Sequence, residues 1–173
     1  MADRLFEMVL YGASGFTGKL VAEYVASDHR DLRWAIAGRN AQKLDEVRRE
    51  LKLPELPILV ADSDDPDSLS AMARQTRTLI STVGPYAQYG TPVLKACANE
   101  GTHYCDLTGE VQWMAEVYEQ INPIAQSSGA RLVHCCGFDS IPSDLSVFFL
   151  QKQFKARFGS YATHVTGRMG RAA

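Results

Sequence analysis

The feature that most constrains the fold is a glycine-rich turn that directly follows the first apolar run. Residues 6–11 are apolar apart from Glu7, and glycines follow at positions 12, 15 and 18 before a stretch of helix-forming residues. This order predicts a β-strand, a tight turn and an α-helix whose free N–H groups point at an anion. We expect Gly12 to permit the turn, Gly15 to let the backbone approach a pyrophosphate, and Gly18 to let helix and strand pack closely.

The spacing of the turn is G-x-x-G-x-x-G, in which Ser14 and Thr17 can offer hydroxyl groups to phosphate. A glycine triplet alone is weak evidence, and an ordinary βα turn is the alternative. The position directly after the first strand favours a dinucleotide-binding loop.

Length and charge exclude several classes of protein. The chain has 173 residues, of which 46% are hydrophobic, so it can bury the core of one domain. A net charge of −2 gives no electrostatic reason to bind nucleic acid or an anionic membrane. No apolar run approaches the roughly 20 residues of a membrane helix, and the first strand begins too close to Met1 for a signal peptide.

The four cysteines predict neither a disulfide nor a metal site. They lie at positions 97, 105, 135 and 136, and none forms a C-x-x-C pair. The adjacent pair is poorly placed for an ordinary disulfide or a shared metal ion. We therefore expect reduced, mostly buried thiols in a cytoplasmic protein.

Strand and helix patterns alternate along the chain. After the first unit, strands are predicted at 33–38, 57–61, 78–83, 103–107 and 131–135. Helices are predicted at 41–51, 66–73, 91–100, 111–127 and 143–154. This alternation predicts an α/β fold with a doubly wound parallel sheet, a Rossmann-type dinucleotide-binding domain over residues 1–158. Residues 159–173 begin like another strand without a partner, and we expect them to start a truncated second, substrate-binding domain.

The cofactor is predicted from the end of the second strand, where NAD-binding folds usually carry Asp or Glu. Arg39 and Asn40 stand there instead. A guanidinium group suits a 2′-phosphate and can stack on adenine, so NADP is favoured over NAD. The alternative is that Arg39 is a solvated residue at a strand end.

Two further turns are expected to contact the cofactor. Asp62 and Ser63 follow the third strand, where the adenine ring would lie, although the D-S-D-D-P run could instead cap the next helix. After the fourth strand comes Val83-Gly84-Pro85-Tyr86, where the ribose and nicotinamide would run.

Five motifs together resemble the saccharopine dehydrogenase-like oxidoreductases, in the branch that contains the trans-acting enoyl reductases of lipid synthesis. The motifs are G-A-S-G-F-T-G, A-G-R-N, S-T-V-G-P-Y-x-x-Y-G, H-Y-x-D-L-x-G-E and G-F-D-S-I-P-S-D. The resemblance covers residues 5–150, and members of the family are normally about twice as long, with a second α+β domain. It implies a nicotinamide cofactor bound by Gly12, Ser14, Gly15, Phe16, Thr17, Arg39 and the turn at Gly84-Pro85-Tyr86.

The resemblance does not identify a catalytic residue. Candidates near the carboxyl edge of the sheet are Tyr86, Tyr89, Tyr104, Asp106 and Asp139. The tyrosines could equally be packed with bonded hydroxyls, and Asp139 with Ser140 could cap the last helix. His103 and His134 are expected to be buried histidines with satisfied hydrogen bonds.

Three functions remain open from the sequence. The first is an NADP-dependent oxidoreductase that acts on a hydrophobic acyl or lipid-like substrate, and the second is a non-catalytic NADP-binding redox sensor or scaffold. A short-chain dehydrogenase is excluded, because no tyrosine has a lysine four residues later. A true saccharopine dehydrogenase remains possible. Apolar surface left by an absent second domain would favour a homodimer.

Overall fold

The computed structural model describes residues 4–168 and 170, and it contains one six-stranded sheet. The strands are β1 Phe6–Tyr11, β2 Trp34–Gly38, β3 Ile58–Val60, β4 Thr76–Ser81, β5 His103–Asp106 and β6 Leu132–Val133. The helices are α1 Phe16–Asp28, α2 Ala41–Glu50, α3 Pro66–Gln75, α4 Tyr86–Glu100, α5 Val111–Ser128 and α6 Ile141–Phe158. All strand pairs are parallel, in the order β3-β2-β1-β4-β5-β6. The predicted doubly wound Rossmann-type sheet is confirmed.

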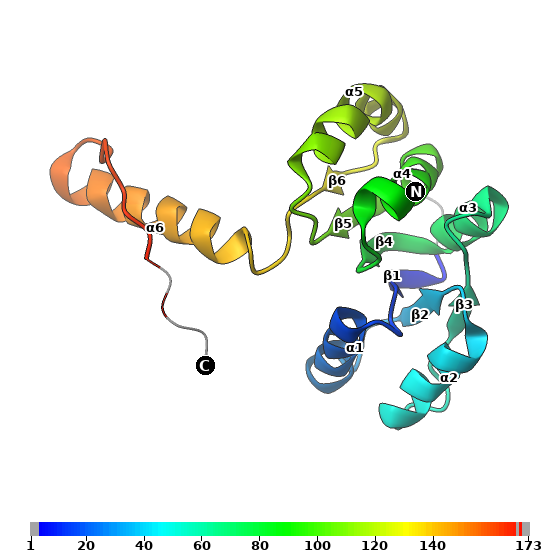
Figure 1. Cartoon of the computed structure of the whole chain (residues 1–173). Helices are drawn as coiled ribbons and strands as arrows, with labels where there is room; N and C mark the ends of the chain where they lie inside the picture. The colour runs from blue at the N-terminus through cyan, green and yellow to red at the C-terminus, as the bar shows by residue number, and fades with distance from the viewer. Residues whose placement is uncertain (1–3, 169, 171–173) are drawn as a thin grey trace.

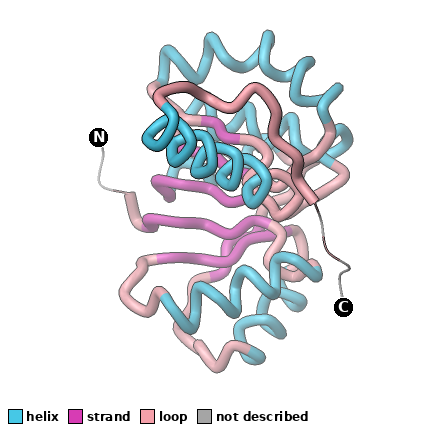
Figure 2. The backbone as a smooth tube through the Cα atoms, turned by 90° about the vertical axis from the view of Figure 1, so that its left-hand side faces the viewer, coloured by secondary structure: helices cyan, strands magenta, loops and turns pink. Residues whose placement is uncertain are grey.

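Helices cover both faces of the sheet, which is why β1 and β2 are apolar on both sides (Figures 1 and 2). On one face, α1 and α2 bury side chains such as Val25 and Leu44 against Leu10 and Ile36. On the other face, α3, α4 and α5 pack against alternate residues of the same strands. Burial of these side chains on two sides stabilises the centre of the sheet.

The strand order reverses at β1, and this reversal positions the functional site. Tyr11 of β1 lies level with Ala37 of β2 and with Ser81 of β4, so three strands end at the same height. In open parallel sheets, ligands bind in the crevice beyond such a point, because the connections leave the strands in opposite directions.

The fourth βα unit differs most from the sequence prediction. β4 ends at Ser81 rather than Val83, and α4 begins at Tyr86 rather than Thr91. Pro92 favours a helix start by its local chemistry, but it lies inside α4. The reason is tertiary, because the Glu110 carboxylate accepts from the N–H groups of Tyr86 and Ala87 and so caps the earlier start.

The last helix projects away from the sheet (Figure 1). α6 has no buried residue, and large side chains such as Leu145, Phe148 and Phe149 are exposed. The described residues after Gly159 form no strand, so the strand expected there is wrong for that part of the tail. They fold back on α6 instead, where the Gln151 amide bonds both to the N–H and to the C=O of Ala162. Residues 169 and 171–173 of the predicted second domain lie outside the described residues.

Within the described part of the chain, none of the helices combines the length and the apolar character that crossing a bilayer requires.

Candidate functional site

A pocket of about 270 Å³ lies at the carboxyl edge of the sheet, between the ends of β1, β2 and β4 and the turn after β3. It is lined by Tyr11, Gly12, Ser14, Gly15, Gly38, Arg39, Asp62, Ser63, Thr82, Val83, Gly84 and Tyr89. Eight of the predicted cofactor contacts are therefore brought together by the fold.

The glycine-rich turn has the roles expected of Gly12 and Gly18. Gly12 has φ +91°, and a Cβ atom there would lie 2.7 Å from Val83 Cγ2 and 2.8 Å from Thr82 Oγ1. A Cβ atom on Gly18 would lie 2.1 Å from the carbonyl oxygen of Gly12. Only glycine fits either position. Gly12 has a left-handed backbone conformation, and Gly18 lies directly against the backbone of Gly12.

Thr82 fastens this turn to the neighbouring strand. Its N–H donates to the carbonyl of Tyr11 at 2.9 Å, and its hydroxyl lies 3.2 Å from the carbonyls of both Tyr11 and Gly12. Thr82 lies inside the S-T-V-G-P-Y motif but is not among the predicted cofactor residues. The bond is between distant segments, so only the fold reveals it.

The N-terminus of α1 is the free anion-binding end in this site. Gly15 is its N-cap, no side chain caps it, and its first turn has no acidic residue. The neighbouring helices differ, because Asn40 caps α2, Asp65 caps α3 and the Glu110 carboxylate binds the first N–H groups of α4. Unpaired N–H groups and the helix dipole therefore favour a phosphate at α1.

Asn40 has a local role that the sequence analysis did not assign. Its Oδ1 accepts from the N–H of Lys43 at 3.0 Å, and its side chain does not line the pocket. The structure thus uses this predicted cofactor residue as a helix cap.

Arg39 is exposed at the end of β2 and lines the pocket. Among residues 4–168 and 170, no carboxylate forms a salt bridge with its guanidinium group. The group is thus free to pair with a phosphate at the place where a ribose 2′ position would lie.

The two alternatives for the D-S-D-D-P run fall on different residues. Asp65 Oδ1 accepts from the N–H groups of Asp67 and Ser68 and caps α3. Asp62 and Ser63 line the pocket, although Asp62 Oδ1 also accepts from the N–H of Asp64 at 3.1 Å. Asp65 thus caps the helix, while Asp62 and Ser63 line the pocket.

Tyr11 is a wall of the pocket that the sequence analysis missed. Its hydroxyl lies 3.1 Å from Ser63 Oγ, and this pair joins the end of β1 to the turn after β3. Burial raises the pKa of Tyr11. The sequence signal for Tyr11 was its position as the last residue of the first predicted strand, directly before Gly12.

Tyr86 is directed into the core rather than into the pocket. Its hydroxyl donates to the carbonyl of Ser81 at 3.0 Å, and its ring stacks on Trp113 with centroids 5.6 Å apart. Burial raises the pKa of Tyr86 to about 12. The early start of α4 turns this side chain inward, and neither Tyr86 nor the N-cap residue Pro85 lines the pocket.

Phe16, Thr17 and Gly18 form the first turn of α1 next to the pocket, without lining it. Phe16 is 84% exposed, so its ring contributes little to the core. The first turn of α1 therefore contributes its backbone, and not its side chains, to the site.

Of the five catalytic candidates, only Tyr89 lines the pocket. Asp106 is buried instead, where Tyr104 donates to it at 2.9 Å and His134 Nδ1 lies 2.7 Å away. Asp139 is exposed in the loop before α6, and the alternative cap there is absent too, because the side chain of Ser140 makes no capping bond. The Asp106 cluster holds the ends of β5 and β6 together.

The histidines and cysteines show no ligand arrangement. His103 Nδ1 accepts from the N–H of Arg131 at 3.1 Å and His134 Nδ1 lies 2.7 Å from Asp106 Oδ2, so both histidines have the expected partners. They are half-buried rather than buried, and His134 lies just after β6. All four cysteines are free, but only Cys97 is buried. Cys105 and Cys135 are half-buried and Cys136 is exposed, so the prediction of mostly buried thiols is wrong. In the part of the chain that the structure describes, no group of three or more metal-ligating side chains is assembled.

Comparison with known families identifies the domain that contains this pocket. Residues 8–133 match the model of the saccharopine dehydrogenase NADP binding domain. The chain belongs to this family. NADP is therefore the cofactor of the domain, and the prediction of NADP is confirmed.

Two of the curated relatives come from mycobacteria. A trans-acting enoyl reductase of Mycobacterium bovis (strain BCG / Pasteur 1173P2) is 44% identical over 154 residues, 88% of this chain and 37% of the relative. A protein of Mycobacterium tuberculosis (strain H37Rv), provisionally named for the same activity, is 50% identical over 149 residues, 85% of this chain and 36% of the relative. The chain thus spans about a third of the length of these relatives.

Solved structures support the fold. Saccharopine dehydrogenase (L-Glu forming) from Saccharomyces cerevisiae superposes with a TM-score of 0.71 at 18% identity, over 88% of this chain and 32% of that one. Triphenylmethane reductase from Citrobacter sp., in complex with NADP(H), gives a TM-score of 0.58 at 17% identity, over 87% and 54%.

The residues of the pocket fit this cofactor. Gly12 and Gly15 leave backbone exposed where a side chain would fill the space, and the N-terminus of α1 is uncapped. Arg39 is an unpaired cation at the end of β2. The individual contacts of the cofactor remain predictions.

Proposed function

We propose that this domain holds NADPH for the reduction of a hydrophobic enoyl or other acyl substrate. The observation that carries the proposal is 44% identity to a trans-acting enoyl reductase over 154 residues, which is 88% of this chain. The Arg39 side chain and the free α1 N-terminus support the choice of a phosphorylated dinucleotide.

Each part of the pocket has one task in this proposal. The α1 N-terminus and the Gly15 backbone bind the pyrophosphate, and Arg39 pairs with the 2′-phosphate. Asp62 and the Tyr11–Ser63 pair border the adenosine half, and Val83, Gly84 and Tyr89 border the nicotinamide half. Bound NADPH supplies a hydride, while these residues orient the dinucleotide and exclude water from one side.

We also propose that residues 159–173 begin a second, substrate-binding domain. The crevice beyond the strand ends provides only one wall for a substrate. α6 exposes apolar side chains around its whole circumference, which is typical of a helix that packs against further protein. A homodimer that covers α6 is the alternative, and sedimentation would detect it as twice the mass of the chain.

A cytoplasmic location is part of the proposal. Four cysteines without a disulfide fit a reducing compartment.

The test combines cofactor binding with turnover. NADPH and NADH are titrated against the chain, and NADPH oxidation is then followed with a panel of enoyl and other acyl thioesters. We expect NADPH to bind and turnover to require a longer protein that contains this chain. Absence of NADPH binding would overturn the proposal. Binding without turnover in either protein would favour the sensor or scaffold.

A further inference from the structure

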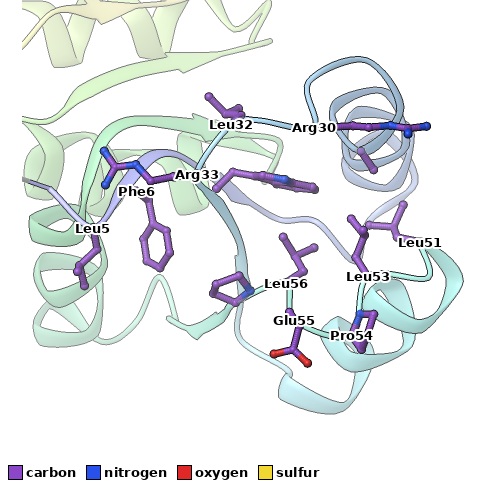
Figure 3. A pocket seen from close by; sticks show the side chains of 13 residues that line it. Leu5, Phe6, Arg30, Leu32, Arg33, Leu51, Leu53, Pro54, Glu55 and Leu56 are labelled. Atoms are coloured by element: carbon purple, nitrogen blue, oxygen red, sulfur yellow. The ribbon is translucent and has the colours of Figure 1, made fainter.

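A hollow of about 760 Å³ lies at the amino edge of the sheet, opposite the cofactor pocket, and its walls are mostly apolar (Figure 3). Arg30 and Arg33 lie at opposite ends of this hollow and point away from each other, so they do not present paired charges to one ligand. The carboxyl edge differs, because polar groups from several elements meet there at a single atom, the carbonyl oxygen of Gly12.

The Gly12 carbonyl joins the glycine-rich turn, the start of α1 and the end of β4. Its oxygen accepts from the N–H of Gly15 at 3.0 Å, and the hydroxyl of Thr82 donates to it at 3.2 Å. On a further side it abuts Gly18, where a Cβ atom would lie 2.1 Å from this oxygen. Two hydrogen bonds and a close backbone contact therefore fix the direction of the carbonyl group.

The direction of this carbonyl affects the anion-binding end of α1. Gly15 is the N-cap of α1, and its N–H is the group that the Gly12 oxygen binds. The N–H groups of Phe16 and Thr17 follow directly and have no acceptor within the helix. A rotation of the Gly12 carbonyl would therefore displace the cap and turn these donors away from a phosphate.

Thr82 is placed by the sheet to hold this carbonyl. It directly follows β4, and its N–H donates to the carbonyl of Tyr11 at 2.9 Å, which extends the pairing of β4 with β1. The single hydrogen of its hydroxyl is shared between the carbonyls of Tyr11 and Gly12, both 3.2 Å away. The hydroxyl thus joins the last residue of β1 to the first residue of the turn.

We propose that Thr82 is a positioning residue for the pyrophosphate of NADP(H). The proposal rests on the proposed use of this pocket for the dinucleotide. Thr82 acts through the Gly12 carbonyl, because its hydroxyl holds the turn in the conformation that aims the first N–H groups of α1 at a phosphate. Donors that are already ordered cost less to engage, so the hydroxyl strengthens binding.

The test compares two ligands that share adenosine and a 2′-phosphate. NADPH also carries the pyrophosphate, and adenosine 2′-monophosphate does not. Thr82→Val removes the hydroxyl and keeps the shape of the side chain. We expect the affinity for NADPH to fall about fivefold, the effect of one hydrogen bond, and the affinity for adenosine 2′-monophosphate to stay unchanged. Calorimetry measures the first ligand, and NMR titration measures the second.

Two further variants are matched controls. Thr82→Ser keeps the hydroxyl and should restore the affinity for NADPH. Thr78→Val removes a hydroxyl from β4 itself, where the Thr78 side chain forms no hydrogen bond in the part of the chain that the structure describes. This variant should bind both ligands like the wild type.

Amide hydrogen exchange tests the turn without a ligand. The N–H of Gly15 is protected by its bond to the Gly12 carbonyl, so it should exchange faster in Thr82→Val than in the wild type or in Thr82→Ser. The N–H of Leu79, which is fully buried in β4, should exchange at the same rate in all three proteins. Faster exchange at both sites would indicate a general loss of stability instead of a local role.

Four results would overturn the inference: unchanged NADPH affinity in Thr82→Val, an equal loss for adenosine 2′-monophosphate, no recovery in Thr82→Ser, or unchanged exchange at Gly15. A wild type that does not bind NADPH would refute the proposed function and this role with it. A wild type that binds NADPH as tightly as Thr82→Val would refute only the role of Thr82.

Discussion

The carboxylate of Glu110 caps α4 from 24 residues away, because its Oε1 accepts from the backbone N–H of Tyr86 at 2.7 Å. Its Oε2 accepts from the N–H of Ala87 at 2.9 Å. This bond sets the start of α4 and neutralises that helix end, which leaves the N-terminus of α1 as the anion site beside the cofactor pocket.

Removal of this cap should destabilise the domain. Glu110→Ala leaves two N–H groups without their acceptor, and we expect a loss of about 1–2 kcal/mol in the free energy of unfolding. Urea unfolding measures it. Glu116→Ala, an exposed glutamate on α5, is the matched control and should change stability by less than about 0.5 kcal/mol. Equal effects of the two substitutions would contradict the capping role.

Gly18 should tolerate no side chain. Gly18→Ala places a methyl group against the Gly12 carbonyl, so we expect a loss of about 2–4 kcal/mol or failure to fold, together with weaker NADPH binding. In Gly109→Ala the new methyl group meets no atom within 4 Å, and stability should stay within about 0.5 kcal/mol. Thermal unfolding measures the stability of both variants. A stable Gly18→Ala protein would mean that helix and turn are not in close contact.

Arg39 should distinguish NADP from NAD. Arg39→Ala removes the charge expected to pair with the 2′-phosphate, which should cost about 1.5–3 kcal/mol, roughly tenfold or more in affinity, for NADP and much less for NAD. Calorimetric titration with both cofactors measures the difference. Arg77→Ala, an exposed arginine near the start of β4, is the control. Similar losses for both cofactors in Arg39→Ala would show that this side chain does not bind the phosphate.

Stability should fall in alkaline solution because Tyr86 is held in its neutral form. Its pKa is raised by burial from 10.0 to about 12, so between these values the unfolded chain ionises while the folded chain does not. The contribution is complete below pH 10 and is lost as the pH rises towards 12. Burial also raises the pKa of the Cys105 thiol from 9.0 to about 12. This thiol therefore adds to the loss of stability with rising pH, beginning at about pH 9.

Unfolding by urea at several pH values should therefore give a shallower decline for Tyr86→Phe than for the wild type. This variant also loses the hydrogen bond to Ser81, at a cost of about 1 kcal/mol at neutral pH. Identical slopes would mean that Tyr86 ionises equally in both states.

Much of the fold follows from local sequence. The glycine-rich turn, the apolar strands and the capping position of Asp65 act over a few residues, so the order of elements and the first βα unit could be predicted. The Arg39 side chain at a strand end without a carboxylate likewise indicated NADP, because the cofactor pocket of this architecture always forms at that edge.

Only the tertiary structure decided which polar side chains face the pocket. Tyr86, Tyr104 and Asp106 lie in or after strands, as Tyr11 and Ser63 do, yet the first three are bonded within the core. The difference depends on Glu110 and His134, which come from other elements and fix the helix start and the end of β5. Contacts between residues far apart in the chain leave no local pattern, so a sequence shows which residues reach the carboxyl edge but not which way they turn.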